Sequence, residues 1–242
     1  MIRIKIAGLT VGIDNKYGYI EKLAADYLTE GEPNFTVTAT EEQIREEAGV
    51  LDVKFSDGYL ESIVVYRNIA EILPTYDAFV FHGAVLNYGG EAYAFTAKSG
   101  VGKTTHTRLW LKEFGDGVHY LNGDKPIIRF IDGVPYACGT PWRGKEGYGV
   151  NEIAPLRAIA FLERGATNSA APIPSESIVT RLLTQMYMPR TNRLGAILTM
   201  RLADRITKAV RLVGLKCNMD PSAAHVSLAA MSGKTENGEE ND

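Results

Sequence analysis

The first 75 residues alternate between short apolar runs and amphipathic stretches, which predicts a small α/β unit. Ile2, Ile4 and Ile6 lie on one side of an extended chain, because side chains alternate in direction along a strand. Thr40 and Gln43 have the spacing of a capping box, which opens a helix. The pattern also predicts a helix over 17–28, a strand over 34–39 and a helix over 59–73.

The middle of the chain is rich in apolar runs of strand length. These runs cover 78–87, 92–96, 118–121, 127–131, 134–138 and 158–162. Gly89-Gly90 and Asp132-Gly133 lie between consecutive runs and predict hairpin turns. A helix is predicted over 103–114, directly after a glycine-rich stretch.

The last third is mainly helical in its periodicity. The pattern predicts helices over 177–187, 195–209 and 222–231, and a strand over 211–217. Residues 232–242 contain no apolar side chain and are interpreted as a disordered tail. We therefore expect an α/β fold: an N-terminal segment over 1–75 and a core over 76–231 with antiparallel strands and flanking helices.

Composition and charge narrow the class of protein. Apolar residues make up 45% of the chain, enough for a sizeable core, and the formal charge of −3 argues against sequence-independent nucleic-acid binding. Cys138 and Cys217 are far apart and predict neither a disulfide framework nor a zinc site. With no signal peptide pattern and no apolar run of about 18 residues, we expect a cytoplasmic protein without a membrane span.

Residues 97–104 carry the strongest chemical signal. They read Ala-Lys-Ser-Gly-Val-Gly-Lys-Thr and match the Walker A pattern G-x-x-x-x-G-K-[S/T] except at Ala97. Because the loop lies between a predicted strand and a predicted helix, its amides would face a phosphate at the helix N-terminus. Lys103 would reach the β- and γ-phosphates, and the Thr104 hydroxyl would bind Mg²⁺. The expected nucleotide-binding residues are Ser99, Gly100, Val101, Gly102, Lys103, Thr104 and Thr105.

An acidic partner is expected at the end of a neighbouring strand. Asp124 follows the run 118–121 and could place Mg²⁺ or act as a base; the alternative is an ordinary turn aspartate beside Gly123. The glycine-rich loop over 139–149 carries Arg143 and Lys145, which could neutralise charge in a transition state. The alternative for this loop is a solvated surface segment.

His82 lies in the apolar run before the hairpin, where a lone histidine is more typical of a core. The order of features is nevertheless specific: His82-Gly83, a Gly-Gly hairpin, the phosphate loop, and a strand ending near Asp124. Over about residues 78–165 this order resembles the catalytic domain of HPr kinase/phosphorylase. It resembles more distantly the nucleotide core of ATP-dependent phosphoenolpyruvate carboxykinase.

The resemblance implies a P-loop nucleotide core of that type, with ATP and Mg²⁺ as cofactors and His82 oriented toward Asp124 or the transferred phosphate. HPr kinase-like domains often form rings, so a homo-oligomer is implied as well. The chain departs from the family at two positions. Gly123 stands where the family has the first of two adjacent aspartates, and Thr105 stands where it has glutamate.

Three hypotheses on function follow. The first is a Mg-ATP-dependent kinase that phosphorylates a hydroxyl, on serine or threonine of a peptide or protein, with Asp124, His82, Lys103, Arg143 and Lys145 as catalytic residues. The second is a catalytically silent nucleotide-binding regulatory protein. The third is a kinase for a small molecule such as a free hydroxy or amino acid. The acceptor could bind to residues 1–75 or to the helices after residue 175, and neither region carries a motif.

Overall fold

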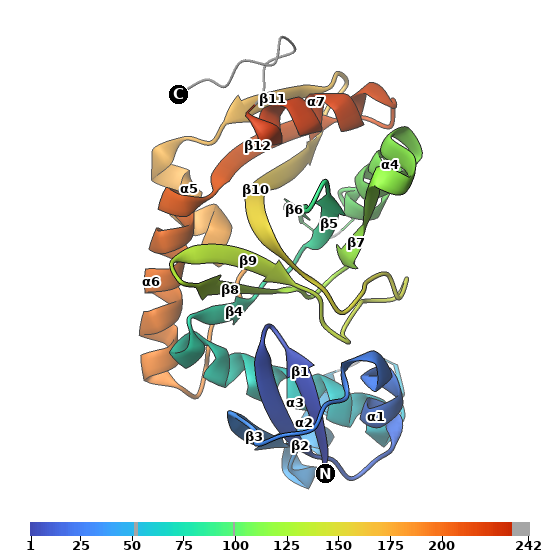
Figure 1. Ribbon diagram of the computed structural model, residues 1–242, viewed down its shortest axis with the longest axis vertical. Helices are drawn as coiled ribbons and strands as arrows, with labels where there is room; N and C mark the ends of the chain where they lie inside the picture. The colour runs from blue at the N-terminus through green and yellow to red at the C-terminus, as the bar shows by residue number, and fades with distance from the viewer. Residues whose placement is uncertain (51–52, 99, 234–242) are drawn as a thin grey trace.

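The computed structural model describes residues 1–50, 53–98 and 100–233. Within these ranges the chain forms a mixed α/β structure with a small N-terminal sheet and a large, curled mixed sheet (Figure 1). None of the helices there combines the length and the apolar character that crossing a bilayer requires. The predicted tail begins too early, because the last helix runs to Ser232; residues 234–242 lie outside the described ranges.

The N-terminal unit packs three helices against the small sheet. Its strands are β1 (Ile2–Ile6), β2 (Leu9–Asp14) and β3 (Phe35–Thr38), and its helices are α1 (Tyr19–Leu23), α2 (Glu41–Val50) and α3 (Asp57–Ile72). β2 pairs antiparallel with β1 and parallel with β3. The capping box is confirmed, because Thr40 Oγ1 accepts from the Gln43 amide at 3.2 Å and Gln43 Oε1 accepts from the Thr40 amide at 3.0 Å.

In this unit one predicted helix is too long, and one strand was missed. The helix expected over 17–28 stops at Leu23 and is followed by a 3-10 helix, Ala25–Tyr27. Strand β2 was not predicted, because the turn before it gives little sequence signal. Ala7 (φ 50°) and Gly8 (φ 72°) both take the left-handed conformation, and an alanine there is not the usual mark of a hairpin turn.

The large sheet is organised around one long strand, β10 (Ile153–Arg164). The other strands are β4 (Ala78–Val80), β5 (Ala84–Tyr88), β6 (Glu91–Thr96), β7 (Val118–Asn122), β8 (Ile127–Ile131), β9 (Val134–Cys138), β11 (Ser169–Pro172) and β12 (Arg211–Cys217). The start of β10 pairs antiparallel with β9, and the remainder pairs parallel with β6 and β12. β10 therefore joins the antiparallel β4-β8-β9 part to the part that holds the glycine-rich stretch before α4. The sequence predicted only 158–162 of this strand and missed β11.

Four helices cover the two faces of this sheet (Figure 1). They are α4 (Lys103–Phe114), α5 (Ser175–Leu183), α6 (Arg193–Ala209) and α7 (Ser222–Ser232). Trp110 of α4 and Met231 of α7 share one core cluster with Phe95, whereas Leu182 of α5 and Ile206 of α6 belong to another. The pairs α4/α7 and α5/α6 therefore lie on opposite faces.

The apolar run over 78–87 is not one strand. It is divided into β4, which pairs with β8, and β5, which pairs with β6 and β7. His82 lies in the break, so the prediction that it sits within a strand was wrong. Gly83 permits the break, because a Cβ there would lie 2.8 Å from the Phe95 carbonyl oxygen. The break carries the chain from one part of the sheet to the other at the edge where the site lies.

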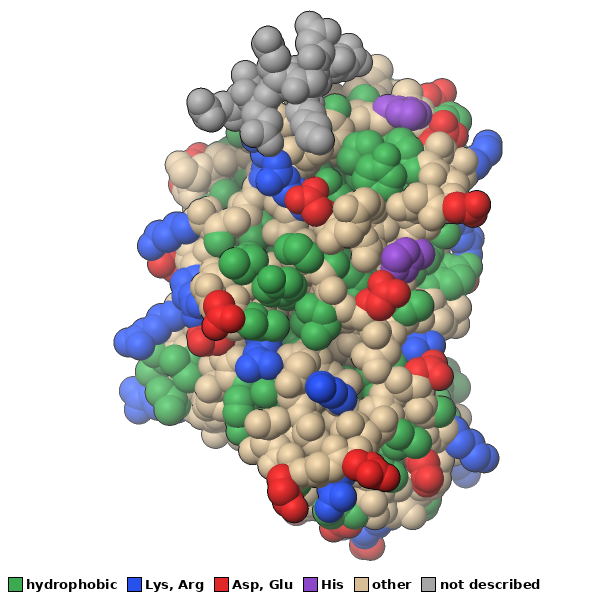
Figure 2. Space-filling view, in the orientation of Figure 1, with side chains coloured by type: hydrophobic (Ala, Val, Ile, Leu, Met, Phe, Trp, Pro, Cys, Tyr) green, Lys and Arg blue, Asp and Glu red, His purple; other side chains and the backbone are tan. Residues whose placement is uncertain are grey.

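The two units share one core cluster, in which Ile6 and Val64 of the N-terminal unit lie with Ile127 of the large sheet. Figure 2 shows acidic and basic side chains interspersed over this face, with the narrower N-terminal unit at the bottom. In Figure 1 the loop between β9 and β10 extends from the large sheet toward α1. This loop therefore contacts both units.

Candidate active site

A cavity of about 530 Å³ lies where the ends of β6 and β7 meet the start of α4 and the loop between β9 and β10. Its lining includes most of the residues singled out in the sequence: His82, Lys98, Gly100, Gly102, Lys103, Thr104, Thr105, Asp124, Arg143 and Lys145. The structure thus brings together, from separate segments, side chains that the sequence distributes over more than 60 positions.

The loop over 97–104 leads into α4 as predicted. Gly102 precedes the helix with φ 120°, and no side chain caps the helix start, so backbone amides of the first turn remain for a ligand. Ala97 does not take a positive φ, so alanine is accommodated where the pattern has glycine. Arg164 holds the loop by donating to the Gly100 carbonyl at 2.6 Å. Ser99, a predicted nucleotide-binding residue, lies outside the described residues.

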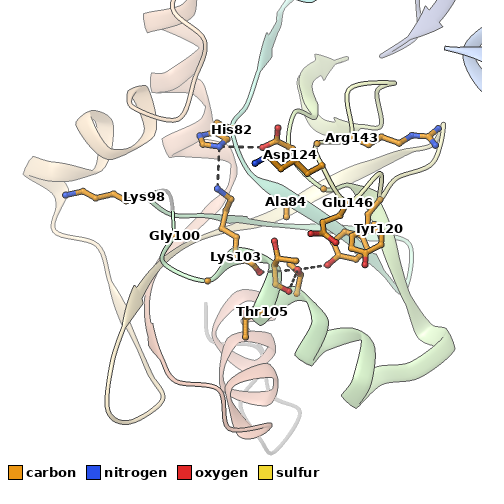
Figure 3. Close-up of a pocket in the computed structure, with 17 residues that line it drawn as sticks. His82, Ala84, Lys98, Gly100, Lys103, Thr105, Tyr120, Asp124, Arg143 and Glu146 are labelled. Carbon is orange, nitrogen blue, oxygen red and sulfur yellow. Dashed lines mark hydrogen bonds and ion pairs between the residues drawn. The ribbon is translucent and has the colours of Figure 1, made fainter. Parts of the chain in front are cut away.

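Three side chains converge over this loop (Figure 3). Nζ of Lys103 lies 3.4 Å from Nε2 of His82, and the same His82 nitrogen lies 3.6 Å from Oδ1 of Asp124. The other carboxylate oxygen, Oδ2, pairs with Nζ of Lys125 at 3.1 Å. The residues come from the first turn of α4, from the break between β4 and β5, and from the turn after β7.

His82 is a neutral imidazole at physiological pH. Burial, with the nearby Lys125 and Lys103 cations, lowers the pKa of His82 to about 4 despite the opposing Asp124 carboxylate. Lys103 has only donors, so Nε2 of His82 accepts and the ring proton is on Nδ1. The contact between His82 and Asp124 is therefore not an ion pair at neutral pH.

Lys103 is half-buried in the same polar cluster. Burial lowers the pKa of Lys103, Asp124 raises it and Lys125 lowers it again. Partial removal from water makes the ammonium a stronger partner for an anion than a fully solvated lysine. Lys98, at the start of the loop, is exposed.

The turn that carries Asp124 is held by a buried asparagine. Asn122 is fully buried, and its Oδ1 accepts from the amides of Asp124 at 2.9 Å and Lys125 at 2.7 Å. Its Nδ2 donates to Oγ1 of Thr140 at 3.0 Å. Gly83, beside His82, donates its amide to the Asp124 carbonyl at 3.1 Å. The carboxylate therefore extends from a rigid turn.

Two loop carbonyl oxygens lie close to Gly123, directly before Asp124. A Cβ at Gly123 would lie 3.1 Å from the Arg143 carbonyl oxygen and 3.3 Å from that of Tyr148. A side chain at this position would be tightly packed, and these neighbours would have to shift by a few tenths of an ångström. Glycine therefore allows the glycine-rich loop to approach the Asp124 turn closely.

The two predicted cations of the glycine-rich loop differ in placement. Arg143 lines the cavity, but its guanidinium turns away from the centre (Figure 3). It pairs with Asp26 of the N-terminal unit at 3.1 Å. A carboxylate 117 positions away in sequence therefore holds the guanidinium, and the role of Arg143 in neutralising transition-state charge stays a prediction. Lys145 is exposed at the rim of the cavity, and Glu146 pairs with Arg108 of α4 at 2.9 Å.

Sequence reasoning missed several residues of the site. Lys125 was not singled out, although an Asn-Gly-Asp-Lys run directly after a strand predicts an asparagine-capped turn that carries adjacent charges. Tyr66 was missed as well, since nothing local shows that its hydroxyl donates to the Lys125 carbonyl at 2.7 Å. Away from the cavity, His106 of α4 is buried and hydrogen-bonded to Ser227.

The oxygen donors of the cavity fit one kind of metal ion. No three His, Cys, Asp or Glu side chains gather into a metal-binding group anywhere in the described ranges. The Thr104 hydroxyl and the Asp124 carboxylate both line the cavity and are hard oxygen donors. Mg²⁺ is usually held by one or two carboxylates together with water and substrate phosphates. The donor set therefore suits Mg²⁺ that arrives with a nucleotide.

Comparison with known proteins adds one finding. No family model and no curated protein matches this chain. Among solved structures the chain is similar to the HPr(Ser) kinase/phosphatase from Coxiella burnetii, with 12% identity and a TM-score of 0.31. The match covers 53% of this chain and 97% of that one.

Proposed function

We propose that this protein binds Mg-ATP in the cavity and transfers the γ-phosphate to a hydroxyl, on serine or threonine of a peptide or protein. The single observation that carries the proposal is the convergence of Lys103 with His82 and Asp124 over an uncapped helix start. The half-buried lysine and the free amides can bind phosphate oxygens. The neighbouring carboxylate can bind the metal ion or accept the proton of the acceptor hydroxyl.

Each residue has a role in this proposal. Lys103 and the first-turn amides of α4 bind the phosphate oxygens, and Thr104 and Asp124 would hold Mg²⁺, which neutralises phosphate charge when bound. The acceptor oxygen bonds to the γ-phosphorus as the bond to the β–γ bridging oxygen breaks, and ADP leaves. Asp124 takes the acceptor proton, serves as metal ligand, or does both. Neutral His82 accepts from Lys103 and orients its ammonium, and Lys145 at the rim of the cavity approaches the phosphates.

The first test concerns nucleotide binding. Lys103→Ala should weaken ATP binding, measured by calorimetry, by at least about tenfold and abolish transfer, because a half-buried cation is lost from the phosphate site. Lys112→Ala is the matched control, since Lys112 is exposed in the last turn of the same helix. Equal ATP affinity in folded Lys103→Ala and wild type would contradict the proposal.

The second test concerns the acceptor. Transfer from γ-labelled ATP is measured to serine- and threonine-containing peptides and, in parallel, to free serine, threonine and small hydroxy acids. Labelling of peptides alone supports the proposed acceptor class. Labelling of the free molecules would instead identify a small-molecule kinase.

A second candidate function is nucleotide binding without transfer. The observation that favours it is Gly123, where the chain carries no second carboxylate and two loop carbonyl oxygens lie within 3.3 Å of the position that a Cβ would take. Tight ATP binding without hydrolysis or transfer above background, across both groups of acceptors, would support this candidate over the kinase.

A further inference from the structure

The N-terminal unit is attached to the turn that carries Asp124. Tyr66 projects from α3, and its hydroxyl donates to the carbonyl oxygen of Lys125 at 2.7 Å. Oγ1 of Thr140 donates to the same oxygen at 2.9 Å. The carbonyl of the residue that follows Asp124 thus accepts one hydrogen bond from the large sheet unit and one from the N-terminal unit.

Tyr66 also contacts the start of the glycine-rich loop. Its ring stacks on the Trp142 indole, with centroids 4.0 Å apart and an interplanar angle of 12°. The Trp142 indole N–H donates to the Ser62 carbonyl, one turn earlier on α3, at 3.0 Å. Because Tyr66 is buried and burial raises the pKa of its hydroxyl, the phenol stays protonated and remains a donor.

The far end of the same loop is tied to the N-terminal unit as well. The Tyr27 hydroxyl donates to the Val150 carbonyl at 3.0 Å, and the Asn151 side chain donates to the Asp26 carbonyl at 2.9 Å. Together with the Arg143–Asp26 pair, these contacts hold the loop at both ends from outside the large sheet. The loop in turn packs on Gly123 and Asp124.

We infer that Tyr66 is a positioning residue for Asp124, through which the N-terminal unit sets the geometry of the transfer site. The contact between Tyr66 and the Asp124 turn is observed in the structure. Its effect on catalysis rests on the proposed function. The N-terminal unit is accordingly part of the site, whether or not it also binds the acceptor. A ligand that shifts α3 would alter the placement of the carboxylate.

The test uses Tyr66→Phe in the full chain, which removes the hydroxyl and keeps the ring that stacks on Trp142. Tyr76→Phe is the matched control, because the Tyr76 hydroxyl also donates to a backbone carbonyl, that of Asn34 at 2.8 Å, away from the site. Both variants are checked for an unchanged thermal midpoint. Tyr66→Phe should lower kcat about tenfold and leave the KM for ATP within about twofold, because positioning acts on the reacting group and not on the phosphate loop.

A second readout does not depend on transfer. Amide hydrogen exchange of a peptide covering 121–126 should be faster in Tyr66→Phe than in wild type or Tyr76→Phe, because the turn has lost one of its holding contacts. Unchanged exchange in Tyr66→Phe, or a KM increase with kcat unchanged, would overturn the inference. Absence of ATP binding by the wild type would instead refute the proposed function, and the exchange result would still decide whether Tyr66 holds the turn.

Discussion

At the scale of single residues, the two oxygens of the Asp124 carboxylate differ in their surroundings. Oδ2 pairs with Lys125, whereas Oδ1 faces a His82 nitrogen that already accepts from Lys103 and so cannot donate to it. Oδ1 is therefore the oxygen available to a metal ion or to an acceptor hydroxyl. The Lys125 pair also keeps the carboxylate from rotating freely.

Asp124→Asn tests this residue, because it preserves shape and removes the charge and the proton acceptor. Single-turnover transfer at saturating Mg²⁺ should fall by about 100-fold or more, the usual scale for a positioned general base. ATP binding without Mg²⁺ should persist, because Lys103 and the phosphate loop are unchanged. Asp132→Asn, in the hairpin turn between β8 and β9, is the control and should transfer at the wild-type rate.

If Asp124→Asn transfers phosphate at the wild-type rate, Asp124 is only a residue of the turn. Glu146 would then be the next acidic candidate in the cavity, although its carboxylate pairs with Arg108 in the present structure.

At the scale of elements, the glycine-rich loop between β9 and β10 is built to lie against the Asp124 turn. Gly144 takes a φ of 76°, and a Cβ there would lie only 2.7 Å from the Asp124 Cβ. Glycine is thus required twice at this position, once for the backbone conformation and once for the close approach. The two requirements can be separated, because a glycine with the same conformation occurs in open space elsewhere.

That glycine is Gly133, with φ 84° and no neighbouring atom within 4 Å of the position that a Cβ would take. Gly133→Ala should lose about 1–2 kcal/mol of unfolding free energy, measured by denaturant titration, because it places alanine in the left-handed region. Gly144→Ala should lose more than this, because its methyl group also meets Asp124. Gly144→Ala alone should also lose at least about tenfold in transfer, since its methyl group displaces Asp124. Equal transfer by the two variants would mean that the loop does not constrain the carboxylate.

At the scale of the whole molecule, α4 and α7 are joined by a buried polar contact. Ser227 of α7 donates to the Ala224 carbonyl, so its Oγ accepts from the Trp110 indole at 2.7 Å and from Nε2 of His106 at 3.0 Å. His106 therefore carries its proton on Nε2, and its buried Nδ1 has no partner in the described structure. Burial lowers the pKa of His106 to about 4.

This arrangement predicts a loss of stability on acidification. The unfolded chain binds a proton at His106 near pH 6.5 whereas the folded chain does so only near pH 4, so stability falls as the pH drops through this window. The loss amounts to about 3 kcal/mol of unfolding free energy and is complete below pH 4. His106→Gln, followed by denaturant unfolding from pH 7 to 4, should flatten the pH dependence by that amount. A pH dependence as steep in His106→Gln as in wild type would contradict this assignment.

Elements that depend on local signals could be predicted from the sequence alone. Helix α4 begins at Lys103 and ends at Phe114 as predicted, and the hairpin strands β8 and β9 have the predicted bounds. The capping box of α2 and the order of loop, helix and Asp124 were also readable. Such features depend on side-chain period, caps and turn residues within a few positions, and these are written directly in the chain.

The tertiary structure alone decided how the site is assembled. The break at His82 follows from strand partners on two parts of the sheet, and the direction of Arg143 follows from Asp26. The close packing at Gly123 follows from loop carbonyls, and the hold on the Asp124 turn follows from Tyr66, 59 positions away from its acceptor. These contacts join residues that are remote in sequence, and their partners are selected by packing and competing charges, for which no local pattern exists.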